Sequence, residues 1–141
     1  MPHRVIKMTD TKPEWKVFRN ALADHDFALA EQLVSKNPDL IRLTNTLGET
    51  ALHWLAVEDD TEAVHWLMKH GADANTRNKF GTPMLFEVAL LEYKELLRWL
   101  LANGADSDLK CAEGLSLSEF LSENAKPQMV RFVEELRTGQ R

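Results

Sequence analysis

The sequence predicts an all-α fold, namely a solenoid of about four helix–turn–helix repeats. Two series of glycines carry this prediction. Gly48, Gly81 and Gly114 are 33 residues apart. Gly71 and Gly104 keep the same interval. A fixed period of this length is typical of helical repeats that stack on one another. Apolar residues between the glycines recur at helical spacing, which indicates that each repeat holds two helices.

The second and third repeats follow the same course. Thr50 precedes the first helix of the second repeat, where its hydroxyl can cap free backbone N–H groups. In the third repeat, Pro83 is expected in the first helical turn, where a missing N–H leaves no bond unmade. Residues 59–61 interrupt the helical pattern and separate the two helices of the second repeat. Gly71 is expected to end the second helix in a left-handed conformation.

The outer repeats depart from this pattern, as the capping repeats of a solenoid usually do. In the first repeat, helices are expected near residues 14–23 and 27–35, and Trp15 is expected to cover the end of the stack. In the last repeat, Ser118 takes a position that is apolar in the middle repeats. We expect neighbouring Leu and Phe residues to fill that space.

Length and composition fit one domain. A chain of 141 residues can bury a sizeable core, and 44% apolar with 28% charged residues is ordinary for a globular protein. The expected domain spans residues 12–136, with repeats at about 12–44, 45–77, 78–110 and 111–136. Residues 1–11 and 137–141 are expected to be flexible ends.

Cysteine usage and hydropathy predict the compartment. The single cysteine, Cys111, cannot form an internal disulfide, which fits a reducing environment. Residues 1–12 lack the apolar stretch of a signal peptide, and no run of 18 apolar residues occurs in the chain. We therefore expect a cytoplasmic protein with no membrane span.

Charge is unevenly distributed along the chain. Residues 46–125 hold 6 Lys or Arg against 14 Asp or Glu, a net charge of −8, whereas the two ends together carry +3. An acidic middle argues against nucleic acid as a partner, because phosphates require clustered Lys and Arg. It is compatible with a basic protein partner. The alternative is that the acidic residues only keep an exposed helical face in water.

Two segments of the middle repeats recur almost residue for residue. GETALH at 48–53 corresponds to GTPMLF at 81–86, and VHWLMKHGAD at 64–73 corresponds to LRWLLANGAD at 97–106. These segments resemble ankyrin repeats, including the G-x-T-x-L-H opening and the L-L-x-x-G-A-D-x-N pattern that closes at Asn75. The resemblance covers most of the chain. It implies a small, stand-alone ankyrin-repeat protein, in which each repeat is a hairpin-like turn followed by two antiparallel helices.

The resemblance also implies where a partner would bind. In ankyrin repeats the turn tips and the first helices line a concave groove, and partners usually dock there. The positions of this chain that correspond to that groove, or flank it, are candidate partner-binding residues. They are Leu47, Glu49, Trp54, Val57, Glu58, Asp59, Lys79, Phe80, Glu87, Leu90, Leu91 and Glu113.

Several of these residues are apolar where core packing does not require it. Leu47 and Phe80 fall at turn tips, and Leu90 and Leu91 fall at a helix end. An apolar cluster with an acidic rim is the usual anatomy of a binding patch, with an aromatic such as Phe80 as its anchor. The alternative is that single exposed apolar residues are common and carry no function. Trp54, in the same groove, is expected either to contact the partner or to be partly buried.

Motifs for chemistry are missing. His53, His65 and His70 lie in one repeat, but no H-E-x-x-H or C-x-x-C pattern accompanies them, so we expect no metal site. His53 matches the histidine of the ankyrin pattern, whose usual role is hydrogen bonding between neighbouring loops. Cys111 is expected at a turn tip, with no histidine beside it to activate the thiol. We expect no catalytic residue and no cofactor. Trp66 is expected to pack in or beside the core.

The function that follows is a non-catalytic protein–protein interaction module, expected to be a monomer. Two alternatives stay open. The chain could be an immunity or inhibitor protein that neutralises a basic toxin or enzyme by occlusion, or it could be a regulatory subunit of a larger assembly.

Overall fold

The computed structural model describes residues 10–139, which form eight α-helices, one 3₁₀-helix and loops. The helices are α2 (Pro13–Ala23), α3 (Phe27–Lys36), η2 (Pro38–Ile41), α4 (Ala51–Val57), α5 (Thr61–Lys69), α6 (Met84–Leu90), α7 (Lys94–Ala102), α8 (Leu117–Glu123) and α9 (Pro127–Thr138). Within the described residues, strand-type pairing is limited to isolated β-bridges. The predicted all-α solenoid is confirmed.

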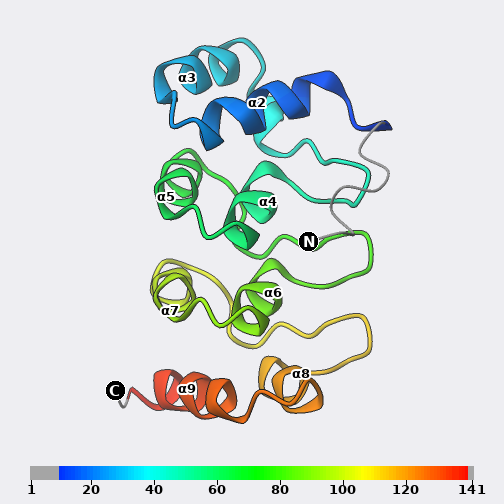
Figure 1. The fold of residues 1–141 in the computed structure, drawn as a ribbon, viewed down its shortest axis with the longest axis vertical. Helices are drawn as coiled ribbons and strands as arrows, with labels where there is room; N and C mark the ends of the chain where they lie inside the picture. Colours follow the sequence, from blue (N-terminus) through cyan, green and yellow to red (C-terminus); the bar gives the residue numbers. More distant parts are fainter. Residues whose placement is uncertain (1–9, 140–141) are drawn as a thin grey trace.

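Four helix pairs stack in two layers. The first helices α2, α4, α6 and α8 form one layer, and the second helices α3, α5, α7 and α9 form the other (Figure 1). Each first helix packs on its own second helix, and α4 also packs on α2 and α6. The loops between repeats project beyond the first-helix layer, on the side away from the second helices (Figure 1). This layering leaves the first helices and the loops on a shared surface.

Local signals set the helix ends as expected, with one correction. The Thr50 hydroxyl accepts a hydrogen bond from the backbone N–H of His53 (3.2 Å) and caps α4. Gly71 follows the last residues of α5 with a φ of 91°, the left-handed conformation expected of it. Pro83 was expected inside the first turn of α6, but it is the residue that precedes the helix, with an extended backbone (φ −64°, ψ 143°). The pyrrolidine ring of Pro83 fixes φ at about −65°, and this angle suits the extended conformation as well as a helical turn.

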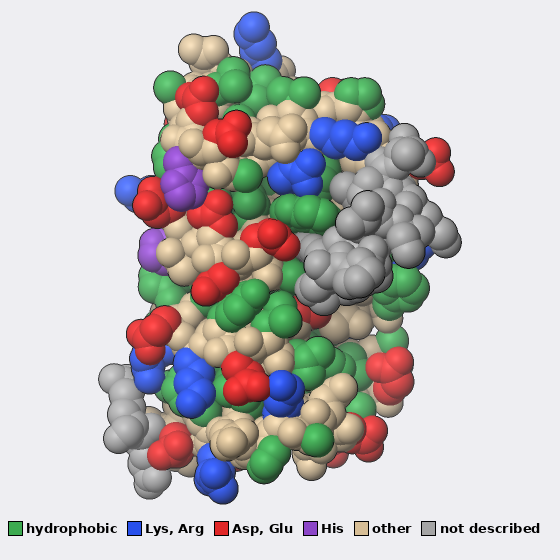
Figure 2. Space-filling model, viewed as in Figure 1, with side chains coloured by type: hydrophobic (Ala, Val, Ile, Leu, Met, Phe, Trp, Pro, Cys, Tyr) green, Lys and Arg blue, Asp and Glu red, His purple; other side chains and the backbone are tan. Residues whose placement is uncertain are grey.

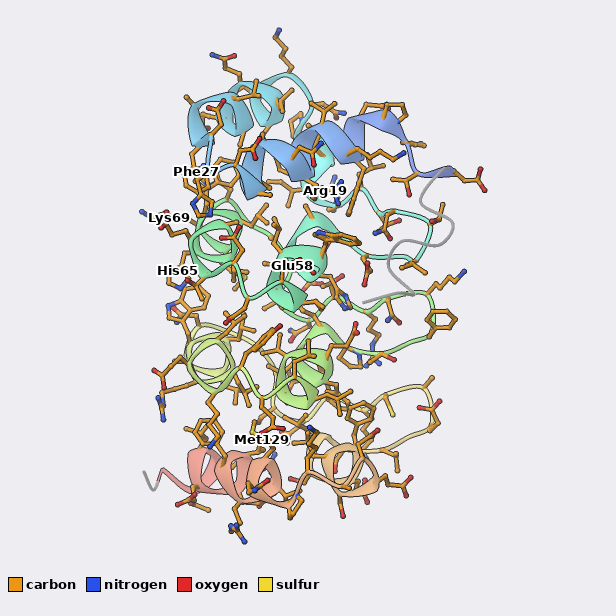
Figure 3. All side chains as sticks on the ribbon, viewed as in Figure 1. Arg19, Phe27, Glu58, His65, Lys69 and Met129 are labelled. Carbon is orange, nitrogen blue, oxygen red and sulfur yellow. The ribbon has the colours of Figure 1, made fainter. Side chains whose placement is uncertain are left out.

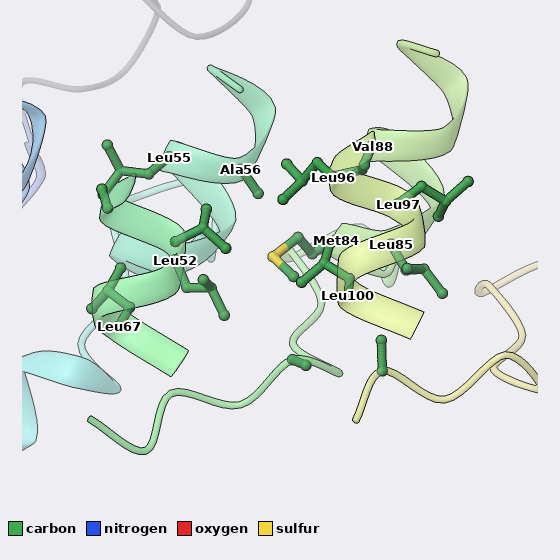
Figure 4. Packing of buried hydrophobic residues seen from close by; sticks show 14 of the residues in the cluster. Leu52, Leu55, Ala56, Leu67, Met84, Leu85, Val88, Leu96, Leu97 and Leu100 are labelled. Atoms are coloured by element: carbon green, nitrogen blue, oxygen red, sulfur yellow. The ribbon is translucent and has the colours of Figure 1, made fainter. Parts of the chain in front are cut away.

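The core is a continuous row of leucines between the two layers. Leu52 and Leu67 from the second repeat and Leu85 and Leu100 from the third belong to one core cluster, and all four are buried (Figure 4). Each such leucine contributes about 1.5–3 kcal/mol of hydrophobic stabilisation relative to an exposed one. Trp15 is also fully buried, in the first helix of the first repeat.

At the other end of the stack, Leu117 and Leu121 fill the core beside Ser118, as expected. The Ser118 hydroxyl donates instead to the carboxylate of Glu134 on α9 (2.5 Å). The absence of an apolar residue at this position is therefore compensated by a hydrogen bond between the last two helices.

The loops between repeats are hairpins that stack on each other. An antiparallel bridge closes each hairpin, and the three bridges are Thr44–Thr50, Arg77–Pro83 and Lys110–Ser116. Neighbouring hairpins are linked directly. The N–H of Lys79 donates to the carbonyl of Leu47 (2.9 Å), and the Arg77 guanidinium donates to the carbonyl of Lys110 (2.5 Å). The hairpins therefore form a continuous, hydrogen-bonded edge of the solenoid.

The expected flexible ends, 1–11 and 137–141, lie largely outside the described residues. Where they are described, they belong to the fold. Thr11 is buried, and its hydroxyl accepts a hydrogen bond from the N–H of Thr46 (3.2 Å). Helix α9 continues to Thr138.

Candidate partner-binding surface

The tip of the second hairpin exposes an aromatic ring. Phe80 is 62% exposed, the highest value among the large hydrophobic side chains of residues 10–139. The Asn78 side chain organises the tip, because its carbonyl oxygen accepts hydrogen bonds from the N–H groups of Phe80 (2.9 Å) and Thr82 (3.1 Å). The ammonium of Lys79 lies 5.3 Å from the centre of the Phe80 ring. The exposure expected of Phe80 is confirmed.

Leu47 occupies the equivalent position of the first hairpin, but it is only 8% exposed, so the exposure expected of it is wrong. Neighbouring segments contact the backbone of the Leu47 turn. The following hairpin packs directly on the Leu47 turn, and its Lys79 N–H donates to the Leu47 carbonyl. On the other side, Thr11 bonds to Thr46, next to Leu47. The first hairpin is therefore bonded to the segment before it and to the hairpin after it.

Val57 is a second correction. It was expected on the exposed end of its helix, but it is 2% exposed in the last turn of α4. Its carbonyl accepts a hydrogen bond from the hydroxyl of Tyr93 in the next repeat (3.0 Å). Leu90 and Leu91, at the corresponding end of α6, are half-buried. The helix ends are thus covered by the adjacent repeat more than their positions in the sequence indicate.

Glu49 and Glu87 belong to a buried polar network. Glu49 is 2% exposed and accepts a hydrogen bond from the Asn45 amide (3.1 Å). His53 is fully buried, and its Nε2 lies 2.5 Å from Oε1 of Glu87. A carboxylate only accepts, so Nε2 carries the donated proton. The hydrogen bonding expected of His53 is present, and it reaches the first helix of the next repeat.

This network contains the one group of potential metal ligands found among residues 10–139. Glu49, His53 and Glu87 each offer a ligand atom, and these atoms lie within 4.8 Å of one another. A cation on Nε2 of His53 would displace its bond to Glu87 and put the proton on Nδ1. Nδ1 is buried without a hydrogen-bond partner, so that proton would be left unsatisfied. We therefore interpret the cluster as structural.

The first helices carry an acidic surface next to an aromatic one. Glu58 and Asp59 are exposed at the end of α4, and desolvation raises the pKa of Asp59 above its usual value. Trp54 is half-buried, which agrees with the partial burial that was one of the two expectations for it. The Arg19 guanidinium lies 4.9 Å from the centre of the Trp54 ring, and the Trp15 ring meets it edge-on at 5.8 Å. Figure 3 labels Arg19 on α2 and Glu58 on α4 below it.

A hollow of about 510 Å³ opens between the α2–α3 turn and the α4–α5 turn. Its lining includes Trp54 together with four carboxylates and one imidazole. These are Glu58, Asp59, Asp60, Glu62 and His25. Acidic side chains gather at the level of α4 and α5, with a histidine near them (Figure 2). The sequence signal for this hollow is the acidic run at the end of the first helix.

The third hairpin differs from the first two. Glu113 is exposed at its tip. Cys111, which was expected at the tip, is instead buried at the base of the turn, in the place of Asn45 and Asn78. Its thiol donates to the carboxylate of Glu113 (3.1 Å).

Sequence reasoning missed a surface on the outer side of the second helices. The Trp66 ring stacks on Phe27 (6.0 Å between centres) and on His70 (3.7 Å), and His65 stacks on Trp99 (4.0 Å). A hollow of about 600 Å³ lies among these rings (the Phe27, His65 and Lys69 labels of Figure 3 mark it). Both tryptophans pack beside the core, as expected of Trp66. The recurrence of Trp at the 33-residue interval was the signal for this face.

None of the helices between residues 10 and 139 has both the length and the apolar character needed to cross a bilayer.

Comparisons with known proteins agree with this architecture. The family described as ankyrin repeats (3 copies) matches residues 18–111, more than half of the chain. Among solved structures, an ankyrin repeat domain from Acinetobacter baumannii AYE is similar, with a TM-score of 0.68 and 22% sequence identity. The match covers 88% of this chain and 64% of that one, and at this identity it speaks for the fold alone. A comparison with curated proteins finds no match. The chain belongs to the ankyrin-repeat family.

Proposed function

We propose that this protein is a non-catalytic protein-binding module whose partner contacts the hairpin tips and the first-helix layer. The observation that carries the proposal is the exposed Phe80 ring at the tip of the second hairpin. An exposed phenylalanine loses hydrophobic stabilisation that a partner surface would restore. Exposed single apolar residues are common, but this one stands on the surface where members of the ankyrin family generally contact other proteins.

The other large hydrophobic side chains that are exposed between residues 10 and 139 lie elsewhere. Val17 is on α2 and Leu29 is on α3, both in the first repeat and away from the hairpin tips. Phe80 is therefore the natural anchor on the tip surface, since a few aromatic side chains usually dominate interface energy. The exposed carboxylates of Glu58, Asp59 and Glu113 support it as steering charges.

A second candidate is an inhibitor or immunity function, in which the module occludes a basic toxin or enzyme. The net charge of −8 over residues 46–125 favours it, because opposite charges accelerate association. A regulatory subunit of a larger assembly would use the same tips. In each case we propose a cytoplasmic protein that is a monomer until it binds its partner.

The test is a pull-down from the native organism with the wild type, Phe80→Ala and Leu29→Ala, followed by affinity measurement on the recovered partner. Phe80→Ala should weaken binding by about 2 kcal/mol or more, roughly 30-fold, mainly through faster dissociation. Leu29→Ala removes an exposed apolar side chain from the second helix α3, outside the proposed interface, and should leave the affinity unchanged. Equal affinity of Phe80→Ala and the wild type would show that the tips are not the interface.

An activity assay on the captured partner then separates the candidates. Loss of the activity of a basic enzyme on adding one equivalent of this protein would favour the inhibitor. Recovery in a high-mass complex without inhibition would favour the regulatory subunit.

A further inference from the structure

We propose that the acidic hollow between the first two repeats receives an arginine side chain of the protein partner. This inference rests on the proposed function, because it specifies the chemistry of the partner at the same first-helix surface. The hollow lies between the turn that follows α2 and the turn that follows α4. It is therefore a feature separate from the Phe80 tip.

The walls of the hollow match a guanidinium in shape and charge. Trp54 supplies an aromatic wall, and the volume of about 510 Å³ leaves ample room for one long side chain. Four carboxylates line the hollow, and the only cationic group in its lining is the imidazole of His25. With its four carboxylates ionised, the hollow is therefore net negative whether or not His25 is protonated. An anionic or apolar occupant would be a poor match.

The chain already places basic side chains against these walls. His25 lies with Nε2 at 2.8 Å from Asp60 and Nδ1 at 3.5 Å from Glu62. The Arg19 guanidinium lies over the Trp54 ring, at 4.9 Å from its centre. The second contact is an internal instance of the interaction that we propose for the partner, a guanidinium on a tryptophan.

Asp59 is the carboxylate that this internal arrangement leaves without a cation. No Lys, Arg or His of residues 10–139 lies within 4 Å of its side-chain oxygens. Desolvation raises its pKa, whereas a paired cation would lower it. An incoming guanidinium could donate two hydrogen bonds to this carboxylate while its flat face lies toward Trp54. A lysine ammonium offers the charge but not this combination.

The experiment is an NMR titration of the ¹⁵N-labelled protein that follows the indole N–H signal of Trp54, assigned with Trp54→Phe. The probe is N-acetyl-arginine amide, and the matched control is N-acetyl-citrulline amide, which has nearly the same shape without the charge. Arginine should shift the Trp54 signal saturably, and citrulline should not. In Asp59→Asn, which tolerates the left-handed backbone at this position, binding should weaken roughly threefold or more.

Glu123→Gln, an exposed change on α8, serves as the control variant and should bind the arginine probe as the wild type does. A citrulline shift equal to that of arginine, or an Asp59→Asn protein that binds unchanged, would overturn the inference. The titration uses no partner, so its failure leaves the role of Phe80 intact. Conversely, the titration could show arginine binding while the Phe80→Ala protein still captures the partner. That pair of results would contradict the role of the Phe80 tip and leave the arginine site standing.

Discussion

Gly48 and Lys79 are in backbone contact across two neighbouring hairpins. A β-carbon built on Gly48 would lie 2.5 Å from the backbone nitrogen of Lys79, closer than side chains approach in folded proteins. The same nitrogen donates to the carbonyl of Leu47 (2.9 Å). The hydrogen bond that joins the hairpins therefore requires a residue without a side chain at position 48.

Gly48→Ala should consequently destabilise the protein strongly. Its φ of 75° disfavours alanine by about 1–2 kcal/mol, and the clash with Lys79 adds to this. Gly114→Ala is the matched control, since its φ is 81° but a β-carbon there meets nothing within 4 Å. Urea unfolding should show a loss about twice as large, or more, for Gly48→Ala. Equal losses for the two variants would mean that the close approach has no energetic weight.

Ala125→Gly should stabilise the protein. Ala125 joins the two helices of the last repeat with a φ of 58°, a conformation that glycine adopts without steric cost. We expect a gain of about 0.5–1 kcal/mol in the free energy of unfolding, with part of the conformational gain lost to the more flexible unfolded chain. Ala102→Gly, in the right-handed last turn of α7, should instead lower stability. Thermal unfolding of both proteins decides this, and a loss in Ala125→Gly would contradict the strain argument.

The buried pair of His53 and Glu87 should respond to mutation as a unit. Glu87→Leu leaves Nε2 of the buried His53 imidazole without its partner, and His53→Leu removes the imidazole from the Glu87 carboxylate, which also accepts from the Asn78 amide (3.5 Å). Each should cost about 2–3 kcal/mol. The double variant should lose at least about 1 kcal/mol less than the sum of the two single losses. A double-mutant cycle from urea denaturation measures this. Strictly additive losses would show that the contact carries no coupling.

An exposed ion pair provides the comparison. Glu95→Leu breaks the bond of Glu95 to Arg98 on the surface of α7, and it should change the free energy of unfolding by less than about 0.5 kcal/mol.

The contribution of His25 to stability should fall as the pH rises above 6.5 and through its folded-state pKa. The hydrogen bond to Asp60, with further attraction from Asp60, Glu62 and Asp24, raises the pKa of His25 above 6.5 despite some desolvation. A raised pKa in the folded state means that the contribution is fully present below pH 6.5. It is lost as the pH rises through the folded-state pKa.

His25→Asn, which tolerates the φ of 57°, should flatten the pH dependence of the urea midpoint. Asp60→Asn keeps the cap on the Ala63 N–H but removes the charge, so it should flatten the slope as well. The double variant should have a flatter slope than Asp60→Asn alone only by the part that Glu62 contributes through His25. A slope unchanged in His25→Asn would exclude this pair as the source.

Sequence reasoning worked where a feature depends on its own repeat. The helix cap at Thr50 and the left-handed Gly71 are local, and both follow from residue types at fixed offsets. It was less accurate where burial depends on the next repeat. Leu47 and Phe80 hold the same place in the period and are both apolar, yet one is enclosed and the other exposed. A periodic sequence pattern predicts the same burial for equivalent positions of two repeats.

The sequence by itself determined the repeat length, the two helices of each repeat and the leucines between them, because backbone preferences and helical spacing act over a few residues. Only the tertiary structure decided which side chains meet across repeats. His53 and Glu87 are 34 residues apart along the chain, and stacking brings them into contact. The same stacking buries Val57 and opens the hollow beside Trp54. Contacts of this kind follow from the rotation of one repeat on the next, which residue order does not express.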